Sequence, residues 1–185
     1  MGLFRKSPPR RPTLQRQVPR PWDPPETEFP AVVPISTLQF DRSEQTAIAI
    51  TGMSAYSNGF EFFMTRLIQP DLLGWDEDPV PGAPRAMLTE RHGLQISLQL
   101  SDGRVVTSGK PPVDAKPTEP ILRSRGGGGT SHYTLSRWWA WPLPPSGPLE
   151  FICQLGTGET RVGIDAQLIL DAAQRSIPVW PRNEQ

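Results

Sequence analysis

The sequence predicts a mainly β protein, an antiparallel β-sandwich with one short C-terminal α-helix. Of its 185 residues, 23 are proline and 16 are glycine. A proline inside a helix costs about 3 kcal/mol, which argues against a helical fold. The prolines are clustered, and the windows 35–69, 85–110, 121–141 and 149–177 contain none. Within these windows, polar and apolar residues alternate with the period of two that is typical of strands. An immunoglobulin-like sandwich and a half-open barrel both fit this pattern.

The alternation locates six strands in chain order. Ser57-Asn58-Gly59 reads as a turn between the first two, and Asp102-Gly103 after the third is typical of a hairpin. Gly156 and Gly158 separate the last two, which should also form a hairpin. The strands are expected at residues 45–51, 60–65, 95–100, 133–141, 149–155 and 160–164.

One helix is expected at residues 166–175. Asp165 precedes it as an N-cap, Arg175 lies in its last turn, and Pro178 follows. The apolar residues of this segment recur at helical spacing, so one face should pack on the sheet. These residues are Leu168, Ile169, Ala172 and Ala173.

The zero net charge of the chain conceals a basic arm in front of an acidic body. Residues 1–20 contain six basic residues and no acid, and the remainder carries 13 basic and 19 acidic residues. The chain is therefore divided into a disordered, proline-rich basic arm (1–20), one domain (21–181) and a short tail (182–185). The arm is a solvated tail, a tether to an anionic partner or a segment that folds over its own body. Its basic residues are Arg5, Lys6, Arg10, Arg11, Arg16 and Arg20.

The composition favours a cytoplasmic protein. The arm lacks the apolar stretch of a signal peptide, and no run approaches 18 consecutive apolar residues, so no integral membrane segment is expected. Cys153 is the single cysteine and allows no internal disulfide. It lies on the apolar face of its strand, where a buried and inert thiol is expected.

The segment from Arg123 to His132 is the most conspicuous candidate for binding. Four successive glycines expose backbone N–H groups, and the neighbouring cationic side chains can neutralise an anion. It is not a Walker loop, because no Gly-Lys-Ser/Thr follows and the next element is a strand. A flexible connection between strands is the alternative. The candidate partner- or anion-binding residues are Arg123, Arg125, Gly126, Gly127, Gly128, Gly129, His132 and Trp138.

Trp138 enters this set through the alternation of its strand. One face of residues 133–141 carries Tyr133, Leu135, Arg137, Trp139 and Trp141, and we expect it to face the core. The other face carries His132, Thr134, Ser136 and Trp138, which exposes the Trp138 indole for stacking on a ligand or partner. The alternative is that Trp138 packs beneath the C-terminal helix or a proline-rich segment.

No catalytic residue, metal site or cofactor is predicted. Two histidines and one cysteine are a poor set of zinc ligands, and the nucleophile and metalloprotease motifs are absent from the sequence. An enzyme would need a site assembled from scattered groups, such as His132, Arg125 and Glu61. A third reading is a nucleic-acid-associated protein held through the basic arm.

An ordered series of short motifs resembles a family of uncharacterised actinobacterial proteins of similar length. The likeness covers residues 21–181 and implies a bacterial, soluble, single-domain protein, but it carries over no activity and no catalytic residue. Its motifs are Trp-Asp-Pro-Pro-Glu at 22–26, Tyr-Ser-Asn-Gly-Phe-Glu-Phe at 56–62, the glycine run, Trp-Ala-Trp-Pro-Leu-Pro-Pro at 139–145 and Gly-Pro-Leu-Glu-Phe-Ile-Cys at 147–153.

The leading hypothesis is a non-enzymatic binding module. It would contact an unknown protein partner through the basic arm and the Arg/Gly/Trp surface, with an anionic partner at the arm as a further option. The oligomeric state is not predicted. On this hypothesis, deletion of the arm and Trp138→Ala impair partner capture and leave thermal stability almost unchanged, whereas a stability loss from Trp138→Ala marks a core residue.

Overall fold

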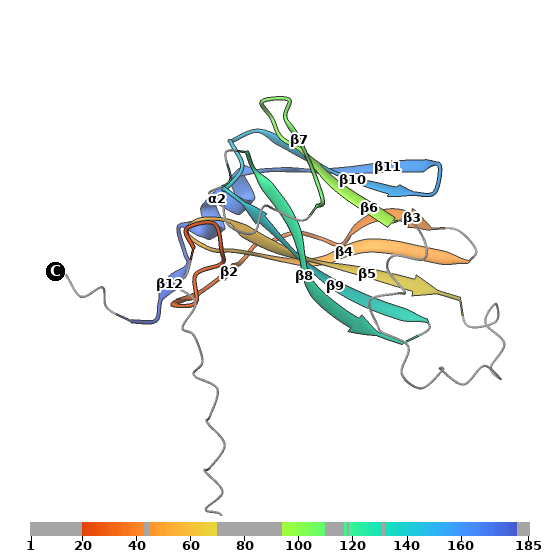
Figure 1. The fold of residues 1–185 in the computed structure, drawn as a ribbon, viewed down its shortest axis with the longest axis horizontal. Helices are drawn as coiled ribbons and strands as arrows, with labels where there is room; N and C mark the ends of the chain where they lie inside the picture. The colour runs from red at the N-terminus through yellow and green to blue at the C-terminus, as the bar shows by residue number, and fades with distance from the viewer. Residues whose placement is uncertain are drawn as a thin grey trace, which may run out of the picture.

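Two antiparallel sheets lie face to face in the computed structural model and enclose the core (Figure 1). The structure describes residues 20–42, 45–69, 94–109, 117, 119–130 and 132–180. The larger sheet has six strands in the order β2-β4-β5-β9-β8, with β3 also paired to β4. Its strands are β2 (Ala31–Val32), β3 (Leu38–Arg42), β4 (Thr46–Ala55), β5 (Phe60–Ile68), β8 (Ile121–Gly129) and β9 (Tyr133–Trp141).

The second sheet has four strands in the order β11-β10-β6-β7. Leu100 and Gly103 close the β6–β7 hairpin through a backbone hydrogen bond of 2.9 Å, at the turn predicted from Asp102-Gly103. The second predicted hairpin, β10–β11, is also formed. The strands are β6 (Leu94–Gln99), β7 (Val105–Thr107), β10 (Pro148–Leu155) and β11 (Gly158–Asp165).

The core lies between these two sheets. Phe62 of β5 meets Phe151 of β10 edge-on, with ring centroids 5.2 Å apart. Cys153 is buried in the same core, as predicted. Full burial of each large apolar side chain contributes roughly 1.5–3 kcal/mol, so this interior accounts for much of the stability. Fully buried members from the two sheets include Ile50, Phe62, Ile96, Leu98, Leu149 and Phe151.

Helix α2 (Gln167–Ala173) covers one end of the sandwich (Figure 1). It is shorter than the predicted segment 166–175, and Ile169, Ala172 and Ala173 pack into the core. The Asp165 carboxylate accepts a hydrogen bond from the Gln167 N–H at 2.9 Å, but the N-cap is Ala166 and not Asp165, and Arg175 follows the helix and does not lie in its last turn. The mainly β fold class and the single C-terminal helix are therefore confirmed, and the described strands do not close into a barrel.

A third sheet joins the two ends of the described chain. Strand β1 (Glu28–Phe29) pairs with β12 (Ile177–Pro178), with Phe29 opposite Ile177. The Val179 N–H extends the pairing by donating to the Thr27 carbonyl at 2.8 Å. This pairing places the start of the described chain beside its end. The residues just before β1 lie over the six-stranded sheet.

Candidate binding site

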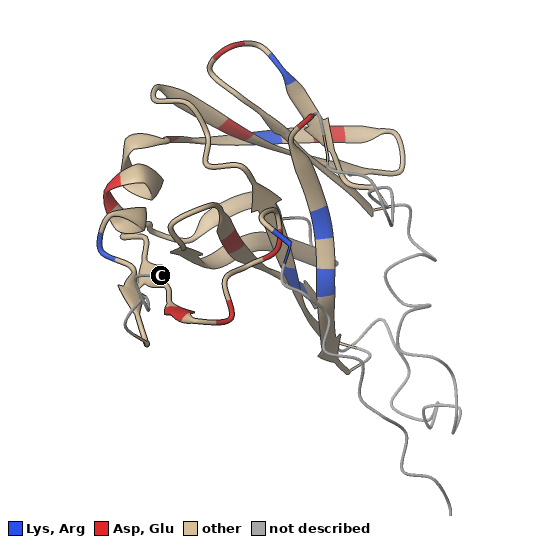
Figure 2. Ribbon diagram, turned by 60° about the vertical axis from the view of Figure 1, so that its left-hand side comes forward, with Lys and Arg blue, Asp and Glu red and all other residues tan. Residues whose placement is uncertain are grey.

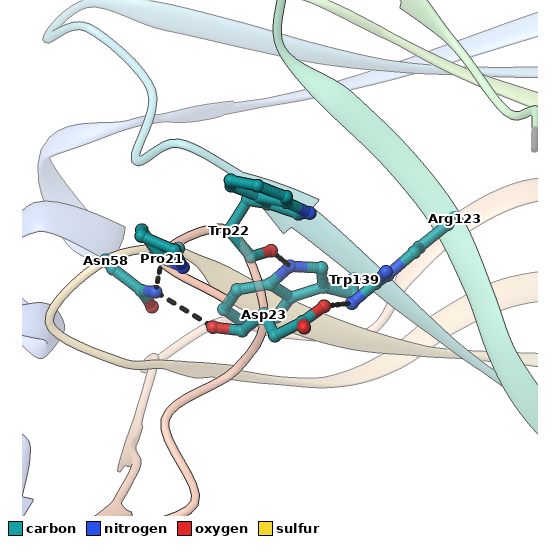
Figure 3. Close-up of polar contacts among 6 residues, drawn as sticks. All are labelled: Pro21, Trp22, Asp23, Asn58, Arg123 and Trp139. Carbon is teal, nitrogen blue, oxygen red and sulfur yellow. Dashed lines mark hydrogen bonds and ion pairs between the residues drawn. The ribbon is translucent and has the colours of Figure 1, made fainter. Parts of the chain in front are cut away.

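Residues 20–28, here called the N-terminal strap, lie over the outer face of the six-stranded sheet (Figure 3). The Trp139 indole N–H donates to the Trp22 carbonyl oxygen at 2.9 Å. The Asn58 side-chain amide donates to the Pro21 and Asp23 carbonyl oxygens at 2.8 and 2.9 Å. These bonds satisfy strap carbonyl groups, so the strap is held to the sheet without being one of its strands.

Charged groups at both ends of the strap add to this attachment. Asp23 forms an ion pair with Arg123 of β8. Glu28 accepts hydrogen bonds from the Ser57 N–H at 3.0 Å and from its hydroxyl at 2.6 Å. Arg123 was predicted to contact a partner or an anion, and the structure places its guanidinium against the chain's own carboxylate.

Trp139 is the sheet residue that binds the strap through its indole N–H. Its side chain is 0% exposed, although it points away from the core between the sheets. Tyr56 meets it edge-on, with ring centroids 5.6 Å apart. Gly59 lies against the same ring, and a Cβ there would come within 2.7 Å of the indole and 2.5 Å of the Ala140 carbonyl oxygen. A glycine at 59 is therefore required for this packing.

A buried carboxylate lies beside this aromatic pair. Glu61 of β5 is directly opposite Trp139 in the sheet register and is 7% exposed. Burial raises the pKa of the Tyr56 phenol, and the Glu61 carboxylate raises it further, whereas Arg125 and Arg137 lower it. The four ionisable groups thus share one region of the outer face.

Beyond the strap, the described residues of the outer face form a groove of about 430 Å³. Phe63 and Arg137 are paired across β5 and β9, and Leu135 is paired with Gly128 across β9 and β8. Figure 2 shows blue, basic positions along β8, the strand that forms one wall of the groove. The groove is lined by Phe63, Arg125, Gly126, Gly127, Gly128, Gly129, Tyr133, Leu135 and Arg137.

The glycine run forms the wall of this groove as part of a strand. Gly127, Gly128 and Gly129 pair with β9 in the last part of β8, after a bulge at Arg125 and Gly126. The alternative reading of the run as a flexible connection is therefore wrong. A Cβ at Gly127 would overlap the Leu135 carbonyl oxygen, so the close approach of the two strands needs glycine.

The structure corrects the orientation predicted for β9. Trp138 is 7% exposed and stacks on Phe62 in the core, with ring planes 12° apart. Arg137 and Tyr133 are exposed on the outer face instead. The alternation was predicted correctly, but the two faces were exchanged, so the expectation of an exposed Trp138 indole is wrong.

The remaining predicted site residues are distributed as follows. Arg125 and the four glycines line the groove, whereas His132 does not. Arg20 stands at the start of the strap, with its guanidinium 5.9 Å from the Trp22 ring centroid. The other basic residues of the arm, Arg5, Lys6, Arg10, Arg11 and Arg16, lie outside the described residues.

Sequence reasoning missed four lining residues of the groove. Arg137, Tyr133 and Leu135 were assigned to the core face of their strand, and Phe63 was read only as part of an aromatic strand. The signal that marks them is the arginine at 137. A charged side chain in the middle of an alternating face indicates the solvent side of a sheet.

The scattered enzyme site considered above is not assembled. Glu61 is opposite Trp139 in β9, whereas the His132 carbonyl oxygen accepts the Ile68 N–H at the far end of β5. Seven residues of extended chain separate 132 from 139, a distance of roughly 23 Å. Within the described ranges, acidic, histidine and cysteine side chains also form no cluster suited to a metal ion.

Comparison with protein-family models, with curated proteins and with solved structures found no match. No helix in the described part of the chain is long and apolar enough to span a membrane.

Proposed function

We propose that this chain is a non-enzymatic binding module of a bacterial, cytoplasmic protein. The groove on the outer face of the six-stranded sheet binds a protein partner, and the basic arm adds a second, electrostatic contact.

The observation that carries this proposal is a pair of exposed arginines, Arg125 and Arg137, above an apolar floor. Arg125 and Arg137 line the same groove, and neither forms an ion pair or a hydrogen bond within the residues described by the structure. Arg104, Arg123 and Arg161, in contrast, each form an ion pair with a nearby carboxylate. Two positive charges on adjacent strands repel each other. An anionic group bound between them relieves this repulsion, so the pair favours an anionic ligand.

The strap supports a joint role for the arm and the groove. Trp139 and Arg137 are two positions apart on the same face of β9, a distance of about 7 Å. The strap is bound at Trp139, so the described residues that follow the arm in sequence lie near the groove. A partner in the groove would therefore meet the arm at a high effective concentration.

Affinity capture from the native cell tests the proposal. The wild-type chain is compared with the double variant Arg125→Gln, Arg137→Gln and with a chain lacking residues 1–19. A second double variant, Arg104→Gln, Arg175→Gln, removes the same charge from surfaces remote from the groove. We expect the groove variant to lose the captured partner and the charge-matched control to retain it. Equal capture by both double variants would contradict the proposal.

A further inference from the structure

We infer that the groove takes a short acidic peptide in extended conformation, with carboxylates at Arg125 and Arg137 and an apolar side chain between them. This inference rests on the proposed function and adds the chemical class of the partner.

The charges of the groove select carboxylates. Arg125 projects from the bulge of β8, and Arg137 lies on the adjacent strand, so two guanidinium groups face one groove. Guanidinium groups bind carboxylates through two parallel hydrogen bonds, which adds direction to the charge attraction. A bulge is a common means of re-aiming one side chain out of the regular alternation.

The floor of the groove selects an apolar side chain as well. Phe63, Leu135 and Tyr133 line it, and Tyr133 is 40% exposed. A wholly charged ligand would leave this apolar surface in water. A peptide that carries an aliphatic or aromatic residue next to its acids covers the surface and gains about 25 cal/mol for each Å² of apolar area.

The backbone of β8 favours an extended ligand. β8 is an edge strand of its sheet, and Ser124–Gly127 are exposed. The Gly126 N–H donates to the Ser124 hydroxyl at 3.3 Å, but the glycines carry no side chains, so an extended peptide in the groove can lie close to the β8 backbone. At the other end of β8 the Gly109 N–H donates to the Leu122 carbonyl oxygen at 3.3 Å, so among the described residues the exposed part of this edge is the glycine end.

The charge distribution favours a peptide over a nucleic acid. Outside residues 1–20 the chain carries 13 basic and 19 acidic residues, so the body repels a long polyanion. Two arginines also contact far fewer phosphates than nucleic-acid binding proteins use. A short peptide with a few carboxylates needs only the local positive charge of the groove and the arm.

Fluorescence anisotropy with synthetic probes tests the inference. The probe is a labelled peptide of about eight residues in which Glu alternates with Leu. The controls are the same peptide with Gln for Glu or with Ala for Leu, and a single-stranded oligonucleotide of equal charge. Each probe is titrated with the full chain, the chain lacking residues 1–19 and the two double variants described above.

We expect the acidic peptide to bind the wild-type chain and to lose at least about tenfold in affinity on Arg125→Gln with Arg137→Gln. The control Arg104→Gln with Arg175→Gln should leave its affinity unchanged. Replacement of Glu by Gln or of Leu by Ala in the probe should each weaken binding. Loss of the arm should reduce affinity several-fold and flatten its salt dependence.

Three outcomes overturn the inference. These are no binding of the acidic peptide, equal binding by both double variants, and tighter binding of the oligonucleotide through the same two arginines. If cellular capture depends on Arg125 and Arg137 while no acidic peptide binds, the proposed function stands and only the peptide class is wrong. If capture is also independent of these arginines, the proposed function fails with it.

Discussion

The indole N–H of Trp139 donates a hydrogen bond to the backbone carbonyl oxygen of Trp22 at 2.9 Å, across 117 positions of sequence. This bond ties the N-terminal strap to the outer face of the six-stranded sheet. The neighbouring Trp138 points the opposite way into the core, where its indole N–H has no partner among the described residues. The two adjacent tryptophans therefore serve different purposes: Trp139 anchors the strap, and Trp138 fills the sandwich.

Paired substitutions separate these two purposes. Trp139→Phe and Trp138→Phe remove the same atoms from buried sites, but only the first leaves a partly buried carbonyl oxygen, that of Trp22, without its donor. We expect Trp139→Phe to lower the free energy of unfolding by about 1–3 kcal/mol more than Trp138→Phe. Urea unfolding followed by circular dichroism measures both. Equal losses would show that the hydrogen bond to Trp22 is not important for stability.

Gly59→Ala should destabilise the protein by about 1–3 kcal/mol, since the added methyl group meets the Trp139 ring and the Ala140 carbonyl. Gly128→Ala is the matched control, because a Cβ at Gly128 has nothing within 4 Å. It should change stability by no more than about 0.5 kcal/mol. Thermal unfolding of both variants decides the point, and a neutral Gly59→Ala would contradict the packing described for Trp139.

Burial and the Glu61 carboxylate raise the pKa of Tyr56 above its ordinary value of 10.0. The folded state therefore holds the phenolic proton at a pH where the unfolded chain has lost it. The contribution of this pKa difference to the free energy of unfolding is fully present below pH 10. It is lost as the pH rises through the pKa of the folded state. In the variant Tyr133→Phe, Tyr56 is the single tyrosine, and its ultraviolet titration should have a midpoint above that of free tyrosine. A midpoint at 10 or below would be inconsistent with this environment.

Asp23→Asn removes the charge that pairs the strap with Arg123. Because both side chains are partly exposed, the loss of global stability should not exceed about 1 kcal/mol. Amide hydrogen exchange in residues 20–28 should nevertheless become faster, since the strap opens locally. Asp102→Asn is the control, because Asp102 pairs with Arg104 on the other sheet and should leave the strap unchanged. Unaltered exchange in the Asp23 variant would show that the ion pair does not hold the strap.

Local sequence signals predicted six of the twelve described strands, β4, β5, β6, β9, β10 and β11, together with the turns at 57–59, 102–103 and 156–158. The unbroken alternation at 95–100 became β6, and Asp102-Gly103 formed the hairpin that follows it. The burial of Cys153 and Ile169 also followed from local periodicity. These predictions succeeded because alternation, helical spacing and turn residues act within a few positions of the chain.

The candidate groove could not be predicted in the same way. A period of two divides the residues of a strand between two faces, but it does not say which face meets the second sheet. In β9 both faces carry large aromatic residues, so hydrophobicity alone did not distinguish Trp138 from Trp139.

The sequence by itself determined that this chain forms antiparallel strands with a short C-terminal helix, and that its positive charge is concentrated at the start. The tertiary structure decided which side of β9 faces the core. It also decided which arginine forms an ion pair within the chain, and which arginines line the groove. Arg123 is paired because the strap returns Asp23 to it, 100 positions away in sequence. Arg125 and Arg137 share a groove because β8 and β9 are adjacent and a bulge turns Arg125 outward. Contacts between distant segments depend on strand order and register, and these emerge only when the whole core packs.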